Sequence, residues 1–467
     1  MAEVKYVHQN VAFEAVDPAN GKFLVKNRFY FTNLQKYMIS YTIKANGKTV
    51  KGGKMSVNVE PQGSKEITIA TSGLKSKPGT EYFIYFNVTT TEPEPLIPVG
   101  HEIAYEQFRL PIEPGERTFA TGGPALKVSA EGNELTASSS KVNFVFDKKT
   151  GLVSSYKVGG TEYFKDGFGL QPNFWRAPND NDYGNGNPKR LQVWKQSSKN
   201  FNVVDANIVM DGKDAVLTAN YLLAAGNLYI VTYRISPSGV VKADFTFTST
   251  DMEAAKTEAS EATLMATFTP GSDAARKAAS KLEVPRIGVR FRLPAEMNQV
   301  EYFGRGPEEN YIDRNAGTLI DLYKTTADQM YFPYVRPQEN GYHTDTRWLT
   351  LNKKGGKGLT IYADKTIGFN ALRNSVEDFD GEETVSRPYQ WLNRDAGELV
   401  HDESKAKDQL PRKTHINDIT PRNFVEVCVD MKQQGVAGYN SWGARPEPGY
   451  NIPANQEYKW GFTIVPR

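Results

Sequence analysis

The chain has 467 residues, which is enough for two or three domains of ordinary size. Its 56 Lys and Arg residues against 54 Asp and Glu residues leave a formal net charge of +2, which gives no electrostatic reason to expect a nucleic acid or a charged membrane as partner. No apolar run approaches the roughly 20 residues that cross a bilayer, and the opening "MAEVKYVHQN" lacks the apolar core of a signal peptide. The compartment stays open.

The first hundred residues carry short β-rich runs separated by turn signals, among them "KFLVKNRFYFTN", "KEITI" and "EYFIYFNVTT". The sequence "ANGK" occurs at 19–22 and again at 45–48, and its Asn-Gly pair favours tight hairpins. Runs at this spacing predict an immunoglobulin-like sandwich over 1–115. The Pro-, Gly- and Thr-containing stretch "IEPGERTFATGGPA" has no periodicity and predicts a linker, which we place at 116–125.

Strand patterns resume near 126 and continue to the end of the chain, with hairpins expected around 148–151 and 237–239. Helix is expected only at 272–282 and for about one turn in "TTADQM". Because no second linker interrupts this β-rich region, 126–467 is expected to form one large two-sheet sandwich. The predicted fold class is therefore all-β. The single cysteine, Cys428, lies in the alternating run "NFVEVCVDMK" and is expected to be buried in a strand, with no disulfide.

Common catalytic and metal-binding motifs are missing from the sequence. The five histidines form no metal-type cluster, and "NDNDYGNGN" at 179–187 fails the spacing of a calcium loop. A nucleophile elbow and a phosphate-binding loop are absent. Glycoside hydrolysis needs two positioned carboxylates, and spacing alone cannot pair the acidic residues that stand out: Glu308, Glu309, Asp313 and Glu339. No catalytic residue and no metal ligand is assigned.

Two segments stand out as candidate binding regions. In "QPNFWRAPNDNDYGNGN" (171–187), Phe174 and Trp175 are expected to anchor a strand end, and Arg176 can fork two hydrogen bonds to a carboxylate or to carbonyls. The Asn, Asp and Gly residues that follow predict a mobile polar loop that faces a ligand. In "QGVAGYNSWG" (434–443), the tryptophan either packs beneath its loop or presents its face to a sugar, whose C–H groups suit an indole ring.

Two further segments, "EYFGRGPEENYIDRNAG" and "YFPYVRPQENGYHTDTRW", mix aromatic, Arg, Glu, Asn and Pro residues in irregular backbone. That composition suits either a buried polar network that fixes long loops or the rim of a sugar site. For Arg305, Asp313 and Arg314 the structural interpretation is preferred.

Together, "FWRAPNDNDYG", "GRGPEENYIDR", "PYVRPQENG" and "GYNSWG", in this order, resemble the signatures of the last domain of the large β-galactosidases of glycoside hydrolase family 2. "VEPQGSKEITI" is similar to phrasing in the preceding sandwich domain of that family. The resemblance implies a second immunoglobulin-like domain at 1–115 and a galactose-mutarotase-like β supersandwich at 126–467. It also implies that the TIM barrel with the catalytic glutamates and the magnesium and sodium ligands is not in this sequence, which would begin just after it.

The resemblance further implies which residues contact a galactoside or an acceptor sugar. Trp442 matches the tryptophan that stacks on the sugar on the leaving-group side, with Asn440 beside it. Asn181, Asp182 and Gly184 match the loop that closes beside the active site, with the glycine as hinge. The expected function is the non-catalytic part of a β-galactosidase acting on substrates such as lactose, inactive alone, with a TIM-barrel domain or subunit as partner. Whether it also forms a homo-oligomer stays open.

Two alternatives remain. The first is an aldose epimerase, whose chemistry needs a His acid and a Glu base, for which His343 and Glu339 are the candidates. The second is a free-standing carbohydrate-binding module.

Overall fold

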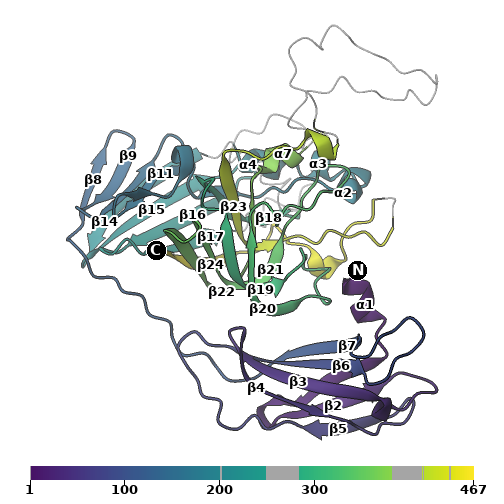
Figure 1. The fold of residues 1–467 in the computed structure, drawn as a ribbon. Helices are drawn as coiled ribbons and strands as arrows, with labels where there is room; N and C mark the ends of the chain where they lie inside the picture. Colours follow the sequence, from purple (N-terminus) through teal and green to yellow (C-terminus); the bar gives the residue numbers. More distant parts are fainter. Residues whose placement is uncertain (1, 200–201, 249–282, 381–412, 414, 441–442) are drawn as a thin grey trace, which may run out of the picture. The chain divides into compact units, whose positions relative to one another are not determined.

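The computed structural model describes residues 2–199, 202–248, 283–380, 413, 415–440 and 443–467 (Figure 1). The fold is nearly all β, as predicted, and divides into two compact units. The first unit comprises 1–119 with 303–307 and 314–323, and the second comprises the remaining residues. None of the helices that the structure describes has the length and apolarity needed to span a bilayer.

The first unit is a sandwich of seven antiparallel strands in two sheets, ordered β1-β2-β5 and β4-β3-β6-β7. This is the strand count of the expected immunoglobulin-like fold. Helix α1 (Ala2–Val7), which the sequence pattern did not predict, precedes them. The strands are β1 (Val11–Asp17), β2 (Lys22–Asn27), β3 (Tyr37–Ala45), β4 (Lys48–Met55), β5 (Ser64–Thr68), β6 (Tyr82–Thr90) and β7 (Glu102–Arg109).

The two Asn-Gly turns of this unit take different forms. Asn46 and Gly47 both have positive φ, 44° and 81°, as a two-residue hairpin between β3 and β4 requires. The turn between β1 and β2 instead contains a 3₁₀ turn, Pro18–Asn20, which ends at Gly21 in the left-handed conformation. Between the sheets lies a core of buried aromatic and branched side chains, in which Phe13 stacks on Phe86 at 4.6 Å.

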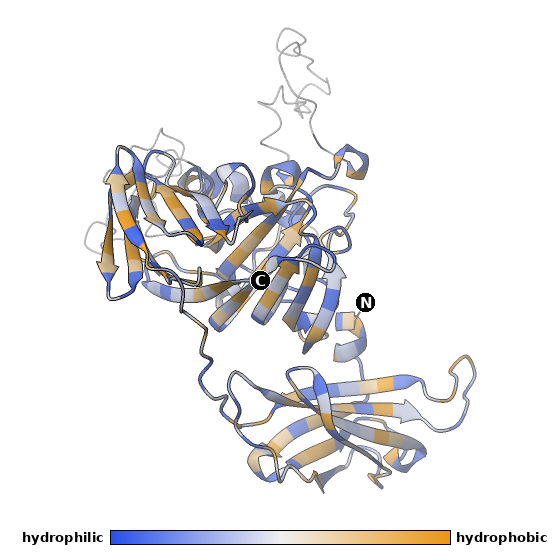
Figure 2. Cartoon of the chain, turned by 60° about the vertical axis from the view of Figure 1, so that its left-hand side comes forward, coloured by the Kyte–Doolittle hydropathy of each residue, from blue (hydrophilic) through white to orange (hydrophobic). Residues whose placement is uncertain are grey.

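The second unit contains a five-stranded sheet, ordered β12-β11-β10-β9-β8, and a larger sheet along the path β13-β18-β23-β22-β24-β17-β16-β15-β14, with β21 paired to β22. Hydrophobic and hydrophilic residues alternate along these strands (Figure 2). The strands are β8 (Lys127–Glu131), β9 (Glu134–Ser138), β10 (Val142–Asp147), β11 (Leu152–Val158), β12 (Thr161–Glu162), β13 (Gln171–Asn173), β14 (Asn202–Asp211), β15 (Asp214–Leu222), β16 (Leu228–Ile235), β17 (Val241–Phe247), β18 (Arg286–Pro294), β21 (His343–Asn352), β22 (Gly358–Leu372), β23 (Phe424–Gln433) and β24 (Tyr458–Pro466).

Strands β19 (Gln299–Gly306) and β20 (Leu319–Thr326) have residues in both units. The expected hairpins are present between β10 and β11 and between β16 and β17, where Gly151 and Gly239 have positive φ. Cys428 is buried in β23, as predicted. The helix expected at 272–282 lies outside the described residues.

One secondary-structure expectation was wrong. The stretch 179–187, predicted as a polar loop, contains helix α2 (Asp180–Gly184), and two further unpredicted helices follow it, α3 (Asn187–Arg190) and α4 (Gln192–Ser197). Together with α7 (Val376–Phe379) they gather at one end of the second unit (Figure 1). Helix forms here because Asn179 and Asp182 cap α2 reciprocally, each side chain accepting the other's backbone N–H.

Candidate functional site

Arg176 ties together the two segments that the sequence singled out. Its guanidinium is buried, with 2% of the residue exposed. Nη2 donates to both carboxylate oxygens of Asp182 over 3.1 Å and to the carbonyl of Gly435 over 3.0 Å, and Nη1 donates to the carbonyl of Gln434 over 2.8 Å. The predicted fork to a carboxylate and to carbonyls is therefore confirmed.

Asp182 lies in the interior. Besides Arg176 it accepts the side-chain amide of Asn187 over 3.2 Å, and only 2% of the residue is exposed. In this structure its carboxylate fixes the start of α2 against the 434–436 backbone. Contact of this carboxylate with a sugar stays an untested prediction.

Asn181 and Asn179 continue the link between the two segments. With its amide oriented to satisfy both polar atoms, Asn181 donates to the carbonyl of Asn440 over 3.0 Å and accepts the N–H of Gly438 over 3.2 Å. Asn179 donates to the carbonyl of Val436 over 3.2 Å. The side-chain amides of Asn179 and Asn181 thus form hydrogen bonds with the backbone of residues 436–440. Polar contacts of this kind hold the backbone in place.

Gly443 lies close to the backbone of Gly184. A Cβ on Gly443 would lie 2.4 Å from the backbone carbon of Gly184, and Gly443 has a φ of +88°. Both constraints exclude larger residues. Next to this contact, Asn440 accepts the N–H of Ala444 over 3.2 Å.

Asp313 holds the other side of the same backbone. Its Oδ1 accepts the N–H of Val436 over 3.0 Å and its Oδ2 that of Ala437 over 2.7 Å. Ala437 has a positive φ of 56°, an uncommon conformation for a residue other than glycine. A Cβ on Gly435 would lie 2.5 Å from Asp313 Oδ2, so the glycine allows the carboxylate to approach. The structural role preferred for Asp313 is confirmed.

The 436–440 backbone leads directly to Ser441 and Trp442, which lie outside the described residues. Tyr439, immediately before them, has 66% of its surface exposed, and its hydroxyl donates to the carbonyl of Arg445. The fold therefore brings Asn440 to the segment that contains Asn181, Asp182 and Gly184, although more than 250 positions separate Asn440 from that segment in the sequence. We call the backbone of 434–440, with Arg176, Asn181 and Asp313 around it, the clamped loop.

The segment "YFPYVRPQENGYHTDTRW" (331–348) also contacts α2. Arg336 forms an ion pair with Asp180 at 2.9 Å, and its guanidinium lies 3.8 Å from the ring centre of Tyr183. This places partly exposed aromatic and charged groups beside α2, as a sugar-binding rim requires.

The acidic candidates have other partners. Glu339 is buried and pairs with Arg286 at 2.6 Å, and Asp430 pairs with the same guanidinium at 2.9 Å. Burial raises the pKa of Asp430 to about 7, against the charge of Arg286 and assisted by that of Glu339. Two carboxylates share one cation, so one of them holds a proton readily.

Glu309 accepts the N–H of Gly341 over 2.7 Å and the hydroxyl of Tyr334, whereas Glu308 is exposed. His343 is buried, with Nδ1 3.1 Å from the carbonyl of Gly341. Glu339 is bound to a guanidinium and His343 is enclosed in the interior, an arrangement that does not suit the acid and base of an epimerase. No group of three or more His, Cys, Asp and Glu is placed to hold a metal ion among the described residues.

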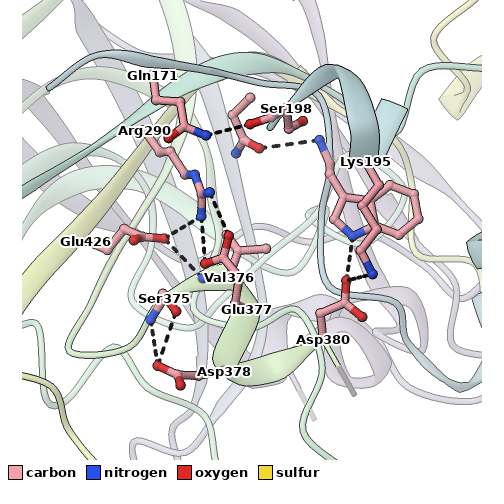
Figure 3. A network of polar contacts seen from close by, with 12 residues as sticks. Gln171, Lys195, Ser198, Arg290, Ser375, Val376, Glu377, Asp378, Asp380 and Glu426 are labelled. Atoms are coloured by element: carbon pink, nitrogen blue, oxygen red, sulfur yellow. Dashed lines mark hydrogen bonds and ion pairs between the residues drawn. The ribbon is translucent and has the colours of Figure 1, made fainter. Parts of the chain in front are cut away.

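A second buried network, not anticipated from the sequence, supports the 171–198 segment from behind (Figure 3). The buried Arg290 pairs with Glu377 at 2.7 Å and with Glu426 at 3.2 Å. Burial alone would raise the pKa of Glu377, but the charge of Arg290 prevails and lowers it. The one available sequence signal was the capping-box pattern "SVED" at the start of α7.

The same network reaches the candidate site through Trp175. Its indole N–H donates to Asp380 over 2.8 Å, and Lys195 pairs with the same carboxyl at 2.9 Å (Figure 3). Ser198 Oγ accepts the N–H of Phe174 over 2.8 Å. These contacts hold Phe174 and Trp175 in place. Because Arg176 follows directly, its backbone position is fixed and its guanidinium is oriented toward residues 434–435.

Two models of known protein families match this chain. The family model described as the β-galactosidase small chain matches residues 138–464, and the model for β-galactosidase domain 4 matches residues 23–111. The chain belongs to the β-galactosidase small-chain family. The resemblance on which the sequence prediction rested is thereby confirmed.

The curated relatives are longer than this chain. A β-galactosidase of Priestia megaterium is 31% identical over 469 residues, which cover 100% of this chain and 39% of that protein. A β-galactosidase of Halalkalibacterium halodurans is 25% identical, covering 99% of this chain and 40% of its own length. The chain therefore spans about two fifths of these relatives.

Among solved structures, galactose 1-epimerase from Lactobacillus acidophilus matches with a TM-score of 0.33 and 7% identity, over 73% of this chain and 98% of that one. A similarity this low carries no argument about the site.

Proposed function

We propose that this chain is the non-catalytic part of a β-galactosidase of glycoside hydrolase family 2 that hydrolyses terminal β-D-galactosides such as lactose. The catalytic glutamates, and the magnesium and sodium ligands, would belong to a TIM-barrel part that corresponds to the portion of the relatives not matched here. The supporting finding is the match of the whole chain to only two fifths of proteins named β-galactosidase.

The clamped loop is the single structural observation that supports a role at the sugar. Arg176, Asn181 and Asp313 fix the backbone of 434–440 through six hydrogen bonds: two from Arg176 Nη atoms to Gln434 and Gly435, two with Asn181, and two with Asp313. An ordinary connecting loop is held only by the elements at its two ends and does not need so many hydrogen bonds along its length. The many polar contacts around this glycine-containing segment therefore suit a binding loop, whose backbone must be held in one conformation.

In the proposed mechanism this chain orients the substrate and transfers no proton. Trp442, at the end of the clamped loop, offers an indole face to the C–H side of the leaving-group or acceptor sugar. Asn440 and Asn181 are the further residues proposed to contact the sugar, through amide groups of the kind that bind sugar hydroxyls, and Gly184 is the proposed hinge of the adjoining segment. A sugar held this way meets the reacting centre in one orientation, which lowers the entropy cost of reaction and of galactosyl transfer.

A direct test separates this chain from the catalytic part. Purified residues 1–467 are expected to give no turnover of nitrophenyl β-D-galactoside, and turnover is expected when the TIM-barrel part is added or fused. Clear hydrolysis by the pure chain, lost when Glu308, Glu309 or Glu339 is changed to Gln, would contradict the proposed division of labour. The nucleotide sequence upstream of codon 1 distinguishes a TIM-barrel domain of the same polypeptide from a separate subunit, because only the first would be encoded there in frame.

A further inference from the structure

The large sheet of the second unit divides at β22. Residues 359–363 of this strand pair with β24, whereas residues 368–372 pair with β23. Residues 364–367 between them pair with neither strand, so β23 and β24 separate there. A cavity of about 360 Å³ lies at this division, lined by residues of β17, β22, β23 and β24. We call it the sheet cavity.

Four charged residues line the sheet cavity: Asp244, Asp364, Lys365 and Lys459. Lys242 contacts Asp244 and pairs with Asp364 at 2.8 Å, which links β17 to β22 across β24. Gly461, the register partner of Asp244, lies beneath them. A Cβ on Gly461 would lie 2.5 Å from Lys242 Nζ, 2.7 Å from Asp244 Oδ1 and 2.7 Å from Asp364 Oδ2. The glycine therefore leaves the space that the charged groups occupy.

The wall of the sheet cavity is apolar and partly aromatic. Trp460 and Met431 both line it and are partly exposed. The Trp460 ring is held in place by Phe245, which stacks on it with 4.4 Å between ring centres and 20° between planes. A large aromatic side chain left partly exposed in a concavity, and fixed from behind, is a feature of ligand sites rather than of cores.

This combination suits one class of ligand. A pyranose has apolar C–H faces that pack on an indole and a thioether, and hydroxyls that donate to carboxylates and accept from ammonium groups. The cavity volume falls in the range of small-molecule sites, about 300–1,000 Å³. The lining carries Lys365 and Lys459 as well as Asp244 and Asp364, so both donors and acceptors for sugar hydroxyls are present.

We propose that the sheet cavity binds a hexopyranose, as a site separate from the clamped loop. It uses none of the residues assigned to the clamped loop, so it stands or falls independently of the function proposed above. Its contribution would be to retain a saccharide on this chain even when no catalytic part is present.

Titration calorimetry of residues 1–467 with D-galactose and with D-glucose tests the proposal. Binding of at least one of them in the millimolar range is expected. Gly461→Val, which fills the space under the charged groups, should weaken binding about tenfold or more. Because that variant alters a strand, Asp364→Ala, which changes only an exposed mouth residue, is measured alongside and should weaken binding as well. Asp211→Ala, on the exposed edge strand β14, is the matched control and should bind like the unchanged chain.

The same experiment distinguishes the two sites. If Trp442→Ala abolishes the binding while Gly461→Val and Asp364→Ala leave it intact, the sheet cavity is not the site and the function proposed above is supported. No heat with either hexose also overturns the proposal.

Discussion

Replacing Asp313 by Ala tests whether the clamped loop is held as the contacts imply. The carboxylate accepts two backbone N–H groups, at 3.0 Å from Val436 and 2.7 Å from Ala437. Hydrogen bonds to a charged group contribute about 1.5–3 kcal/mol each. Asp313 is only partly buried, so the lower end applies, and the pair should contribute about 3 kcal/mol to the closed state of this loop.

Hydrogen exchange of the Val436 and Ala437 amides is the appropriate assay, because it reports local opening. A loss of about 3 kcal/mol should speed their exchange about a hundredfold if they open locally. Asp313→Asn keeps one oxygen acceptor and should give an intermediate acceleration. Asp211→Ala, which removes an exposed carboxylate paired with Arg234, should change nothing at the loop. Unaltered protection of both amides in Asp313→Ala would refute the reasoning.

Three further outcomes are expected. Burial raises the pKa of Asp430 to about 7 from an ordinary 3.8, so the folded state retains this proton; the resulting stabilisation is complete below pH 3.8 and is lost as pH rises through 7. Asp430→Asn should therefore remove up to about 4 kcal/mol of pH dependence from the unfolding free energy between these limits, and an unchanged slope in denaturant titrations would contradict the raised pKa. Arg290→Ala removes the ion-pair partner of Glu377 and leaves Glu426 paired with Arg292, and should lower the unfolding free energy by about 3 kcal/mol, whereas a loss below about 1 kcal/mol would show that the network relaxes without cost. Gly443→Ala adds a Cβ 2.4 Å from Gly184 at a positive φ and should increase proteolytic cleavage within 434–444, with Gly132→Ala, which has open space around its Cβ but a similarly positive φ, as the control for backbone strain alone.

Local patterns identified much of the fold. Alternating runs and turn residues predicted the strands, as at Cys428 in β23 and at the hairpin that turns at Gly151. The error at 180–197 has a local cause. Gly184 and Gly186 and the many Asn residues favour turns, yet the reciprocal cap of Asn179 and Asp182 starts a helix, and the buried Arg176 stabilises it from outside the segment.

The candidate site was only partly predictable, because its contacts join distant segments. The chemistry of Arg176 could be stated from its type, and its partners matched that expectation. The pairing of Asp313 with Val436 spans 123 positions, and no local pattern announces it. The ion pairs of Arg290 with Glu377 and Glu426 were equally unpredictable. Their contribution to stability depends on burial, which arises only when the sheet has folded.

The most direct measurement replaces Trp442 by Ala in a complete β-galactosidase that contains this chain. A sugar platform at this position predicts a higher KM for lactose and a lower ratio of galactosyl transfer to hydrolysis with sugar acceptors, because the acceptor loses its stacking surface. Formation of the glycosyl-enzyme from a nitrophenyl galactoside should change less. Kinetics that equal those of the unchanged enzyme with every acceptor tested would contradict the proposed role of this chain.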